Sequence, residues 1–448
     1  MDNKDRYILY ENKNEFRYDQ DDKKISINFN RVAFIFFLFF IISLIYSIHL
    51  IHLGSRSFDN IAKSKNKIYN KLKRADIVDI NGSFLAKTVS SIDVGINPIE
   101  IIDKKKLLLN LRYIFPNKDY EIVQSKFNKN KFFWFEKKIS DENYEKIMML
   151  GDKSIKPEEK LMRIYPQKNL FSHIIGQIDS DNNGISGLEK SLDDQLKKNI
   201  NSIELTVDKN IQFLIREELI KYNEIFSTKG SAAILMDVDN GEILSLVSLP
   251  DFDPNQRFNI TDVNYINRVT KGIYEFGSVF KTFTLAAGFH EDIIQPDTEF
   301  KDLEKKLQCG NNTISEYDDQ IPSNLTAEQI LIRSGNIGSV RIGQSLGIDK
   351  FKKFMNDLNL INPIQFDIEE IGVPIPFNWG KCKLATTSYG HGITTTMLQL
   401  AKAYSIIVNG GYNINPTLIK NNNNNGQQRT RVLKNSVSKK INPILRKV

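Results

Sequence analysis

Cysteine is almost absent from this sequence, which has only Cys309 and Cys382 among 448 residues. Two cysteines are too few for a scaffold of several disulfides or for a four-cysteine zinc site, and the sequence leaves open whether the two are joined. Internal repeats are also lacking, which excludes a fibrous protein. With 41% hydrophobic and 26% charged residues, the composition excludes a wholly disordered chain and a polytopic membrane protein.

A strong excess of charge of one sign is missing as well. The chain has 61 Lys and Arg against 54 Asp and Glu, a net charge of +7. The lysines are spread along the chain and mixed with acidic residues, and they form no basic helix face and no basic stripe with interleaved aromatics. We therefore predict that the protein does not bind nucleic acid.

One long apolar run is present, at residues 32–53, and reads VAFIFFLFFIISLIYSIHLIHL. As a helix it would be about 33 Å long, enough to cross a hydrocarbon core of about 30 Å. The alternatives are a cleaved signal peptide and a buried core helix, but a signal peptide is usually shorter and ends at a small-x-small site, which is lacking here. The run predicts a single membrane anchor. Basic residues flank it on both sides, so the positive-inside rule alone does not orient it.

After the anchor, residues 54–73 are rich in Lys and Asn and are interpreted as a helical or loose stalk. Short β-like segments follow from residue 74, with a turn predicted at Asn81-Gly82. The pattern is mixed α/β up to about residue 200.

A more regular unit begins near residue 205. Asp208 is expected to cap a helix with apolar residues at helical spacing. Residues 231–248 predict a β-hairpin, and further helices are expected near Ser278 and at 395–408. The Asn-rich tract at 421–425 is interpreted as a surface loop.

Ser278 and Lys281 lie three residues apart and would share one face of a helix that begins here. A serine needs a base to become a nucleophile, and a lysine can act as that base if its pKa is lowered. This is the arrangement of S-x-x-K acyl enzymes. Alone the pattern is weak, because Ser64/Lys67 and Ser436/Lys439 have the same spacing.

A second pattern, Ser334-Gly335-Asn336, follows 56 residues after Ser278 and fits an S-x-N motif. In such a motif the hydroxyl relays a proton and the amide orients the reacting groups. It also has chance companions, at Ser64/Asn66 and Ser180/Asn182. Taken singly, each pattern is more often an ordinary tripeptide, so the surrounding sequence has to decide.

The surrounding sequence resembles that of class B penicillin-binding proteins. The active-site segment is similar at 267–284 (NRVTKGIYEFGSVFKTFT), the second motif at 333–340 (RSGNIGSV), and the Gly-x-Gly stretch with its following helix at 386–411. Further similar segments are the first two strands at 230–255 and the pedestal motifs at 74–86 and 163–196. The segment FFWFEKKIS at 132–140 favours the septal, division-specific branch.

The resemblance implies an α/β (α+β) architecture with a membrane helix, an elongated pedestal and a transpeptidase domain made of an antiparallel sheet and helices. The expected parts are a cytoplasmic tail at 1–31, a transmembrane helix at 32–53, a pedestal of the dimerisation type at 54–204 and the transpeptidase domain at 205–448. The implied location is the inner membrane, crossed once, with the N-terminus in the cytoplasm and the main domains in the periplasm.

The resemblance also implies a reaction. Ser278 would attack the D-Ala-D-Ala carbonyl of a peptidoglycan stem peptide, and Lys281 would deprotonate it. Ser334 would pass a proton to the leaving D-alanine, and Asn336 would orient Lys281 and the substrate amide. The backbone N–H of Ser278 would supply half of an oxyanion hole. Beta-lactams would acylate the same serine, no cofactor or metal is implied, and membrane proteins of the division complex are the expected partners.

The family's third motif, Lys-Thr/Ser-Gly, does not occur in these 448 residues. We interpret this as a premature stop, a split gene or an incomplete record, and we expect the five-stranded family sheet to be reduced to a hairpin. Two hypotheses follow: a septal D,D-transpeptidase, truncated or completed by a second polypeptide, and a non-catalytic remnant that still binds division partners. A soluble β-lactamase is a third alternative, which the anchor and the long pedestal disfavour.

Overall fold

The computed structural model describes residues 16–17, 26–27, 31–54, 74–198, 201–256, 263–421 and 429–448. The chain divides into two compact units, Met1–Lys71 and Leu72–Val448. Residues 55–73 of the predicted stalk and 422–425 of the Asn-rich tract lie outside the described residues.

The first unit contains one long helix, α1 (Arg31–Gly54), and a short antiparallel pair, β1 (Phe16–Arg17) and β2 (Ser26–Ile27). The segment Ala33–His52 of α1 has a mean hydropathy of 2.6, and none of it is buried against protein. By length and composition it can cross a membrane. The helix predicted at 32–53 is therefore confirmed.

The second unit begins with a five-stranded sheet built around one long strand, β4. Its strands are β3 (Ile77–Val78), β4 (Phe84–Ile96), β5 (Phe133–Ile139), β6 (Ile155–Ile164) and β7 (Ile203–Glu204). The strands β5 and β6 pair antiparallel with β4, whereas β3 pairs antiparallel with β4 and parallel with β7. Gly82, with φ +80°, forms the predicted turn between β3 and β4.

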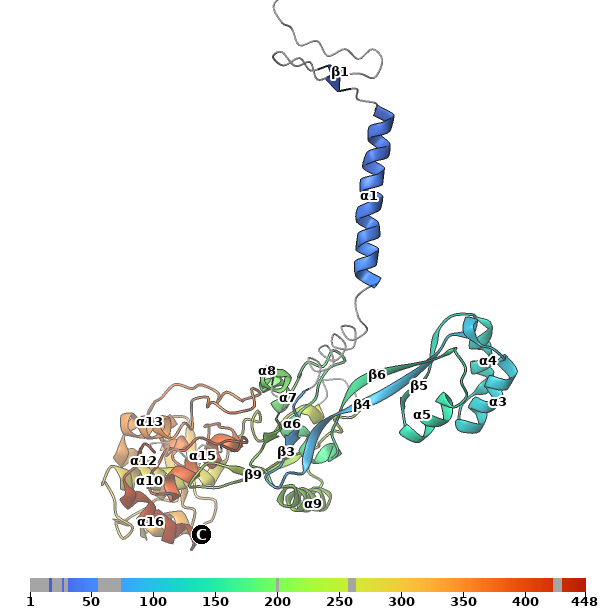
Figure 1. Cartoon of the computed structure of the whole chain (residues 1–448). Helices are drawn as coiled ribbons and strands as arrows, with labels where there is room; N and C mark the ends of the chain where they lie inside the picture. The colour runs from blue at the N-terminus through green and yellow to red at the C-terminus, as the bar shows by residue number, and fades with distance from the viewer. Residues whose placement is uncertain are drawn as a thin grey trace, which may run out of the picture. The chain divides into compact units, whose positions relative to one another are not determined.

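Three helices gather at one end of β4, β5 and β6 (Figure 1). They are α3 (Lys104–Ile114), α4 (Tyr120–Asn128) and α5 (Asp141–Met148), after the short 3₁₀ turn η1 (Pro98–Glu100). Each helix begins at a side-chain cap: Asp103, Asp119 and Ser140 accept hydrogen bonds from the first turn. Buried residues such as Leu111 and Phe127 form a separate core here.

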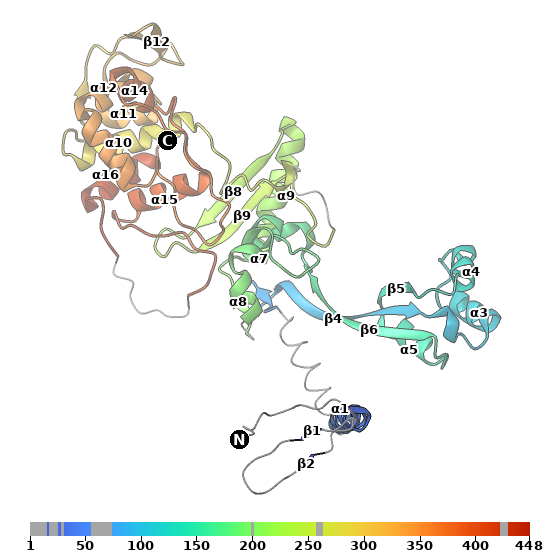
Figure 2. The same cartoon turned by 90° about the horizontal axis from the view of Figure 1, so that it is seen from above.

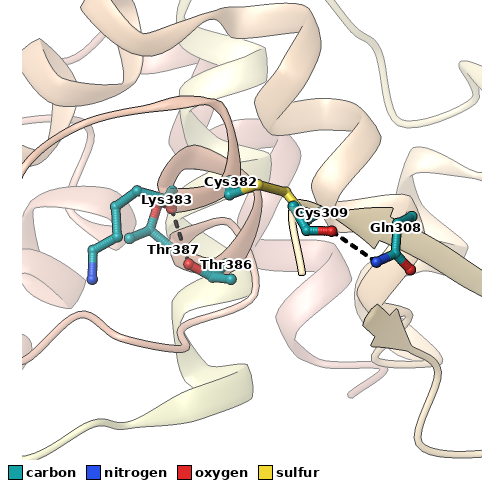
Figure 3. The surroundings of a disulfide bond; sticks show 7 residues. Gln308, Cys309, Cys382, Lys383, Thr386 and Thr387 are labelled. Carbon is teal, nitrogen blue, oxygen red and sulfur yellow. Dashed lines mark hydrogen bonds between the residues drawn. A yellow bond between two sulfur atoms is a disulfide. The ribbon is translucent and has the colours of Figure 1, made fainter. Parts of the chain in front are cut away.

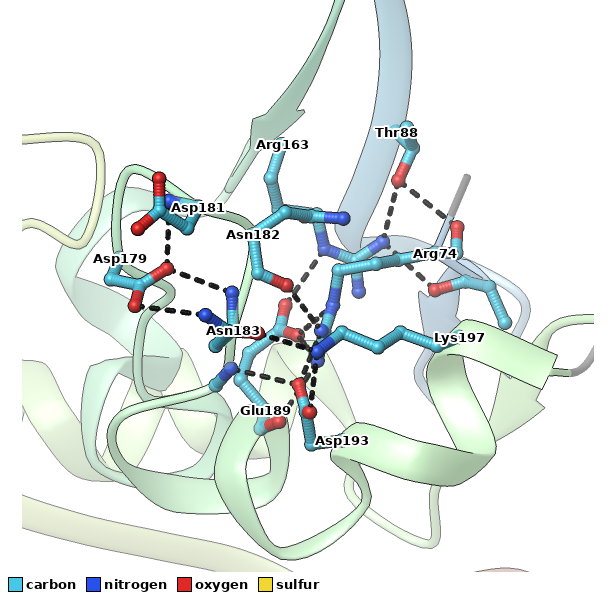
Figure 4. A network of polar contacts seen from close by, with 12 residues as sticks. Arg74, Thr88, Arg163, Asp179, Asp181, Asn182, Asn183, Glu189, Asp193 and Lys197 are labelled. Carbon is cyan, nitrogen blue, oxygen red and sulfur yellow. Dashed lines mark hydrogen bonds and ion pairs between the residues drawn. The ribbon is translucent and has the colours of Figure 1, made fainter. Parts of the chain in front are cut away.

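Near the start of β3, a buried ionic network joins segments that are far apart in the sequence (Figure 4). Glu189 lies between two arginines: its carboxylate forms an ion pair with Arg74 Nη2 at 2.7 Å and accepts a hydrogen bond from Arg163 Nε at 2.7 Å. Arg74 also donates to Asp193 at 2.6 Å. The network holds α7 (Gly187–Ser191), which carries Glu189, and α8 (Asp193–Lys198), which carries Asp193. The short elements η2 (Lys168–Phe171) and α6 (Ser172–Ile175) come before them in the chain.

A two-stranded hairpin and a long helix follow (Figure 2). The elements are α9 (Lys209–Phe226), β8 (Ser231–Met236) and β9 (Ile243–Leu249). Asp208 caps α9 through its side chain, as predicted. Gln212 fastens α9 to β9, because its amide both accepts from Leu246 N at 2.9 Å and donates to Leu246 O at 2.7 Å. The sheet β8–β9 has two strands, as expected.

Seven α-helices are the main regular elements of the remaining described residues, and they enclose the largest core, which includes Phe283, Ile330 and Ile406. They are α10 (Lys281–His290), α11 (Ala327–Ile332), α12 (Asn336–Leu346), α13 (Ile348–Asp357), α14 (Lys381–Thr387), α15 (Met397–Val408) and α16 (Asn435–Leu445), with 3₁₀ turns η3 (Val263–Tyr265) and η4 (Gly277–Phe280). Two small antiparallel pairs complete it: β10 (Glu299–Phe300) with β13 (Leu325–Thr326), and β11 (Lys306–Cys309) with β12 (Asn312–Ser315).

Candidate functional site

Ser278 lies in the 3₁₀ turn η4, directly before α10. The turn begins at Gly277, whose φ of +55° is a conformation that suits glycine. Phe280, which closes the turn, is fully buried and anchors it in the helical core. Ser278 itself is exposed, and its Oγ makes no hydrogen bond with another described residue. The helix expected near Ser278 is therefore present, with a tighter first turn than an α-helix.

Lys281 begins α10 and is almost completely buried, with 2% of its surface exposed. Its ammonium donates to Ser334 Oγ at 2.9 Å and to the Ser334 carbonyl. Burial lowers the pKa of Lys281 from 10.5 to about 8, and the nearby charge of Glu316 opposes that shift. Lys281 therefore has an uncharged hydrogen-bond partner, Ser334, and can lose its proton near neutral pH.

Asn336 is the first residue of α12, and Ser334 lies two residues before it, next to the N-cap residue Gly335. Ser334 has a φ of +54°, a left-handed conformation that is uncommon for serine. The turn brings Ser334 to Lys281, although the two are 53 residues apart in the sequence. The Nδ2 of Asn336 donates to Ser315 O at 2.8 Å, and among the described residues no hydrogen bond joins this side chain to Lys281.

A glycine-containing loop, Tyr389 to Gly392, passes against the turn that carries the serine. A Cβ on Gly390 would lie 1.8 Å from the Gly277 carbonyl oxygen, so only glycine permits this approach. The loop is also held by Glu275, which accepts from Gly392 N at 3.1 Å. The Gly-x-Gly stretch identified in the sequence therefore borders Ser278 in space.

Tyr404, on α15, supports the same turn. Its hydroxyl donates to Thr282 Oγ1 at 3.0 Å and lies 3.2 Å from Val279 O. Burial raises the pKa of Tyr404, and its hydrogen bond with Thr282 only partly opposes this. The hydroxyl therefore stays protonated and holds Val279 and Thr282, which lie two residues before and one residue after Lys281.

The two cysteines form a disulfide that joins strand β11 to helix α14 (Figure 3). The sequence had left the state of Cys309 and Cys382 open. The bond ties the β11–β12 hairpin to the helix that precedes the glycine loop. It therefore links two segments that both contact the candidate site.

Of the four predicted site residues, the structure joins Lys281 and Ser334 directly and places Ser278 one turn before Lys281. Sequence reasoning missed Glu316 and Tyr404, because neither belongs to a motif and both reach the site only through tertiary packing. Among the described residues, no group of three or more His, Cys, Asp or Glu side chains could hold a metal ion.

Two family models match most of the chain. Residues 69–224 match the penicillin-binding protein dimerisation domain, and residues 231–448 match the penicillin-binding protein transpeptidase domain. The network of Arg74, Arg163 and Glu189 falls within the first match, whereas Ser278, Lys281, Ser334 and Asn336 fall within the second.

Several curated proteins are similar to this chain. The probable peptidoglycan D,D-transpeptidase FtsI of Caulobacter vibrioides is 30% identical over 344 residues, which cover 75% of this chain and 58% of that protein. The stage V sporulation protein D of Bacillus subtilis is 29% identical over 393 residues, covering 78% and 59%. The probable peptidoglycan D,D-transpeptidase PenA of Neisseria meningitidis serogroup A is 28% identical over 314 residues, covering 62% and 53%.

The chain thus spans between half and two thirds of the length of these relatives. The order of the matched domains and the relatives agree with the resemblance drawn from the sequence. The chain belongs to the class B penicillin-binding proteins of the division type.

Proposed function

We propose that the protein is a septal peptidoglycan D,D-transpeptidase that cross-links stem peptides through an acyl-Ser278 intermediate. The observation that carries this proposal is the hydrogen bond of 2.9 Å between the buried Lys281 ammonium and Ser334 Oγ, one turn from Ser278. A buried lysine whose pKa is lowered to about 8 is partly neutral near pH 7 and can accept the proton of a serine hydroxyl.

In the acylation step, neutral Lys281 takes the proton of Ser278 Oγ while that oxygen bonds to the carbonyl carbon of the penultimate D-alanine. The peptide C–N bond then breaks. The proton passes from Lys281 through Ser334 Oγ to the departing amine of the terminal D-alanine. The backbone N–H of Ser278 would donate to the oxyanion of the tetrahedral intermediate.

In the second step, the amine of another stem peptide attacks the Ser278 ester. The ester C–O bond breaks, Ser278 Oγ recovers a proton, and the new amide is the cross-link. Penicillin would acylate Ser278 by opening its lactam amide in the same way, with Ser334 protonating the released nitrogen. Asn336 would orient the substrate amide from the start of α12. We assign no anchor for the substrate carboxylate, because the Lys-Thr/Ser-Gly motif is not among these 448 residues.

The test uses the full 448-residue chain in detergent with a fluorescent penicillin. We expect a labelled band on a denaturing gel that disappears in Ser278→Ala. The matched control is Ser436→Ala, since Ser436 and Lys439 have the same S-x-x-K spacing on helix α16 and should not affect labelling. If no band forms in a chain shown to be folded by circular dichroism, the enzyme proposal is wrong and a non-catalytic scaffold remains.

We further propose that α1 crosses the inner membrane once, with residues 1–31 in the cytoplasm and residues 54–204 and 205–448 forming the pedestal and transpeptidase domains in the periplasm. The Cys309–Cys382 disulfide supports this orientation, because such bonds persist mainly outside the reducing cytoplasm. Protease added to intact spheroplasts should degrade the part after α1, and full protection would contradict the orientation. Binding to division-complex membrane proteins stays a prediction.

A further inference from the structure

Helix α12 begins without a capping side chain of its own. Its N-cap residue is Gly335, which makes no side-chain hydrogen bond to the first turn. The residue before it, Ser334, is held in the left-handed conformation. A helix start leaves backbone N–H groups without intrahelical acceptors, and here those groups directly follow the residue that contacts Lys281.

Glu316 supplies the missing acceptors from a different part of the chain. Its Oε2 accepts from Asn336 N at 2.6 Å and its Oε1 accepts from Ile337 N at 2.9 Å. In return, Asn336 Nδ2 donates to Ser315 O at 2.8 Å. Three hydrogen bonds therefore clamp the end of strand β12 to the start of α12, two of them charge-assisted and so stronger than neutral ones.

Glu316 directly follows strand β12, which is itself fixed. Strand β12 pairs with β11 from Ser315 to Asn312, and the side chain of Ile314 is buried in the helical core. The Cys309–Cys382 disulfide joins β11 to α14. A carboxylate on such a support can impose its position on the turn at Ser334 instead of following it.

We propose that Glu316 is a positioning residue of the acyl-transfer site, and that its carboxylate fixes the turn Ser334–Asn336 so that the Ser334 hydroxyl and carbonyl both face the Lys281 ammonium. Glu316 has no contact with the serine nucleophile and acts through Ser334 and Lys281. The effect of Glu316 on acyl transfer rests on the proposed function, whereas its effect on the position of the turn Ser334–Asn336 does not.

The charge of Glu316 gives the role a second, measurable consequence. Among the described residues, the charge that acts on Lys281 is that of Glu316, and it raises the pKa of the lysine against the larger lowering by burial. Removing the charge should therefore let the pKa of Lys281 fall below about 8. A purely structural contact would not shift this pKa.

The experiment compares Glu316→Gln and Glu316→Asp with the control Glu304→Gln in the full chain. Glu304 is exposed just before β11, so its substitution makes the same change of charge away from the site. Hydrogen exchange of residues 333–340 reports the cap, and competitive acetic anhydride labelling of the Lys281 amine across pH reports its pKa. Neither measurement needs an active enzyme.

For Glu316→Gln we expect exchange of residues 333–340 to be roughly tenfold faster, as for the loss of a charge-assisted hydrogen bond, and the labelling curve of Lys281 to move to lower pH. Glu316→Asp keeps the charge on a shorter side chain, so its labelling curve should stay near that of the wild type. Unchanged exchange and an unchanged labelling curve in Glu316→Gln would overturn the proposal.

Penicillin acylation of the same variants then separates this proposal from the proposed function. If the wild type is acylated, Glu316→Gln should react more slowly and its pH profile should move to lower pH. If the wild type is not acylated at all, the proposed function fails, while exchange and labelling still decide whether Glu316 positions the turn.

Discussion

Two regions of the molecule bury cations, and they do so in opposite ways. In the pedestal, Arg74 and Arg163 are enclosed around Glu189, and every one of these ions meets an opposite charge at 2.7 Å (Figure 4). In the helical region, Lys281 is as deeply buried, yet its ammonium donates to the neutral hydroxyl and carbonyl of Ser334.

The difference appears in the ionisation of each region. Burial raises the pKa of Asp193, but hydrogen bonds from Lys197 and Arg74 outweigh it and lower the pKa to about 2, so this part of the network stays charged at physiological pH. Burial lowers the pKa of Lys281 to about 8. A buried cation that is paired with a carboxylate stays charged and stabilises the fold. A buried cation with neutral partners has a lowered pKa and can therefore exchange a proton near neutral pH.

The largest effect should come from breaking the paired region. Glu189→Gln leaves two buried arginines facing a neutral amide, and we expect the free energy of unfolding to fall by about 3–5 kcal/mol. Urea denaturation measures this loss. Glu158→Gln, on the exposed side of β6, is the control and should change the stability by less than about 0.5 kcal/mol. If the free energy of unfolding fell equally in both variants, the buried ion pairs of Glu189 would not be what stabilises this region.

The helical region around Lys281 should make the free energy of unfolding depend on pH. The folded pKa of Lys281, about 8, lies below its usual value of 10.5, so between these values the unfolded chain binds more protons and the free energy of unfolding rises with pH. This contribution is complete above pH 10.5 and is lost as the pH falls through about 8. It amounts to roughly 3 kcal/mol at about 1.36 kcal/mol per pKa unit.

Lys281→Met should remove this rise, and it should also lower penicillin acylation by roughly 10²–10⁴-fold as expected for a lost general base. Urea denaturation from pH 7 to pH 10.5 measures the first effect and gel fluorescence the second. The control, Lys352→Met, replaces an exposed lysine of α13 and should keep the pH dependence of the wild type. A wild-type slope in Lys281→Met would show that Lys281 is not the titrating group.

The smallest effect should come from an ion pair that is not buried. Lys190 and Glu369 lie 3.2 Å apart, and their side chains are 45% and 57% exposed. Glu369→Gln should lower the free energy of unfolding by less than about 1 kcal/mol, since water screens such pairs. Denaturation at low and at high salt checks this. A loss comparable to that of Glu189→Gln would mean that burial is not what distinguishes the pedestal network.

Local sequence signals were sufficient for many individual elements. The cap at Asp208, the turn at Gly82 and the apolar run of α1 were all readable, because each depends on residues close together in the chain. The resemblance added Ser278, Lys281, Ser334 and Asn336 as a set. The role of Asn336 beside Lys281 stays a prediction, and the structure adds that its Nδ2 donates to Ser315 O, a contact with a strand that no motif mentions.

By itself, the sequence determined the membrane-length helix, and through its resemblance to a family it predicted the order of the domains and the serines and lysine of the site. Only the tertiary structure decided that Cys309 and Cys382 are joined, that Arg74 and Arg163 share Glu189, and that Glu316 caps the helix after Ser334. The physical reason is distance along the chain. Caps, turns and apolar runs follow from neighbouring residues, whereas burial and ion pairing depend on segments that meet only after the chain has folded.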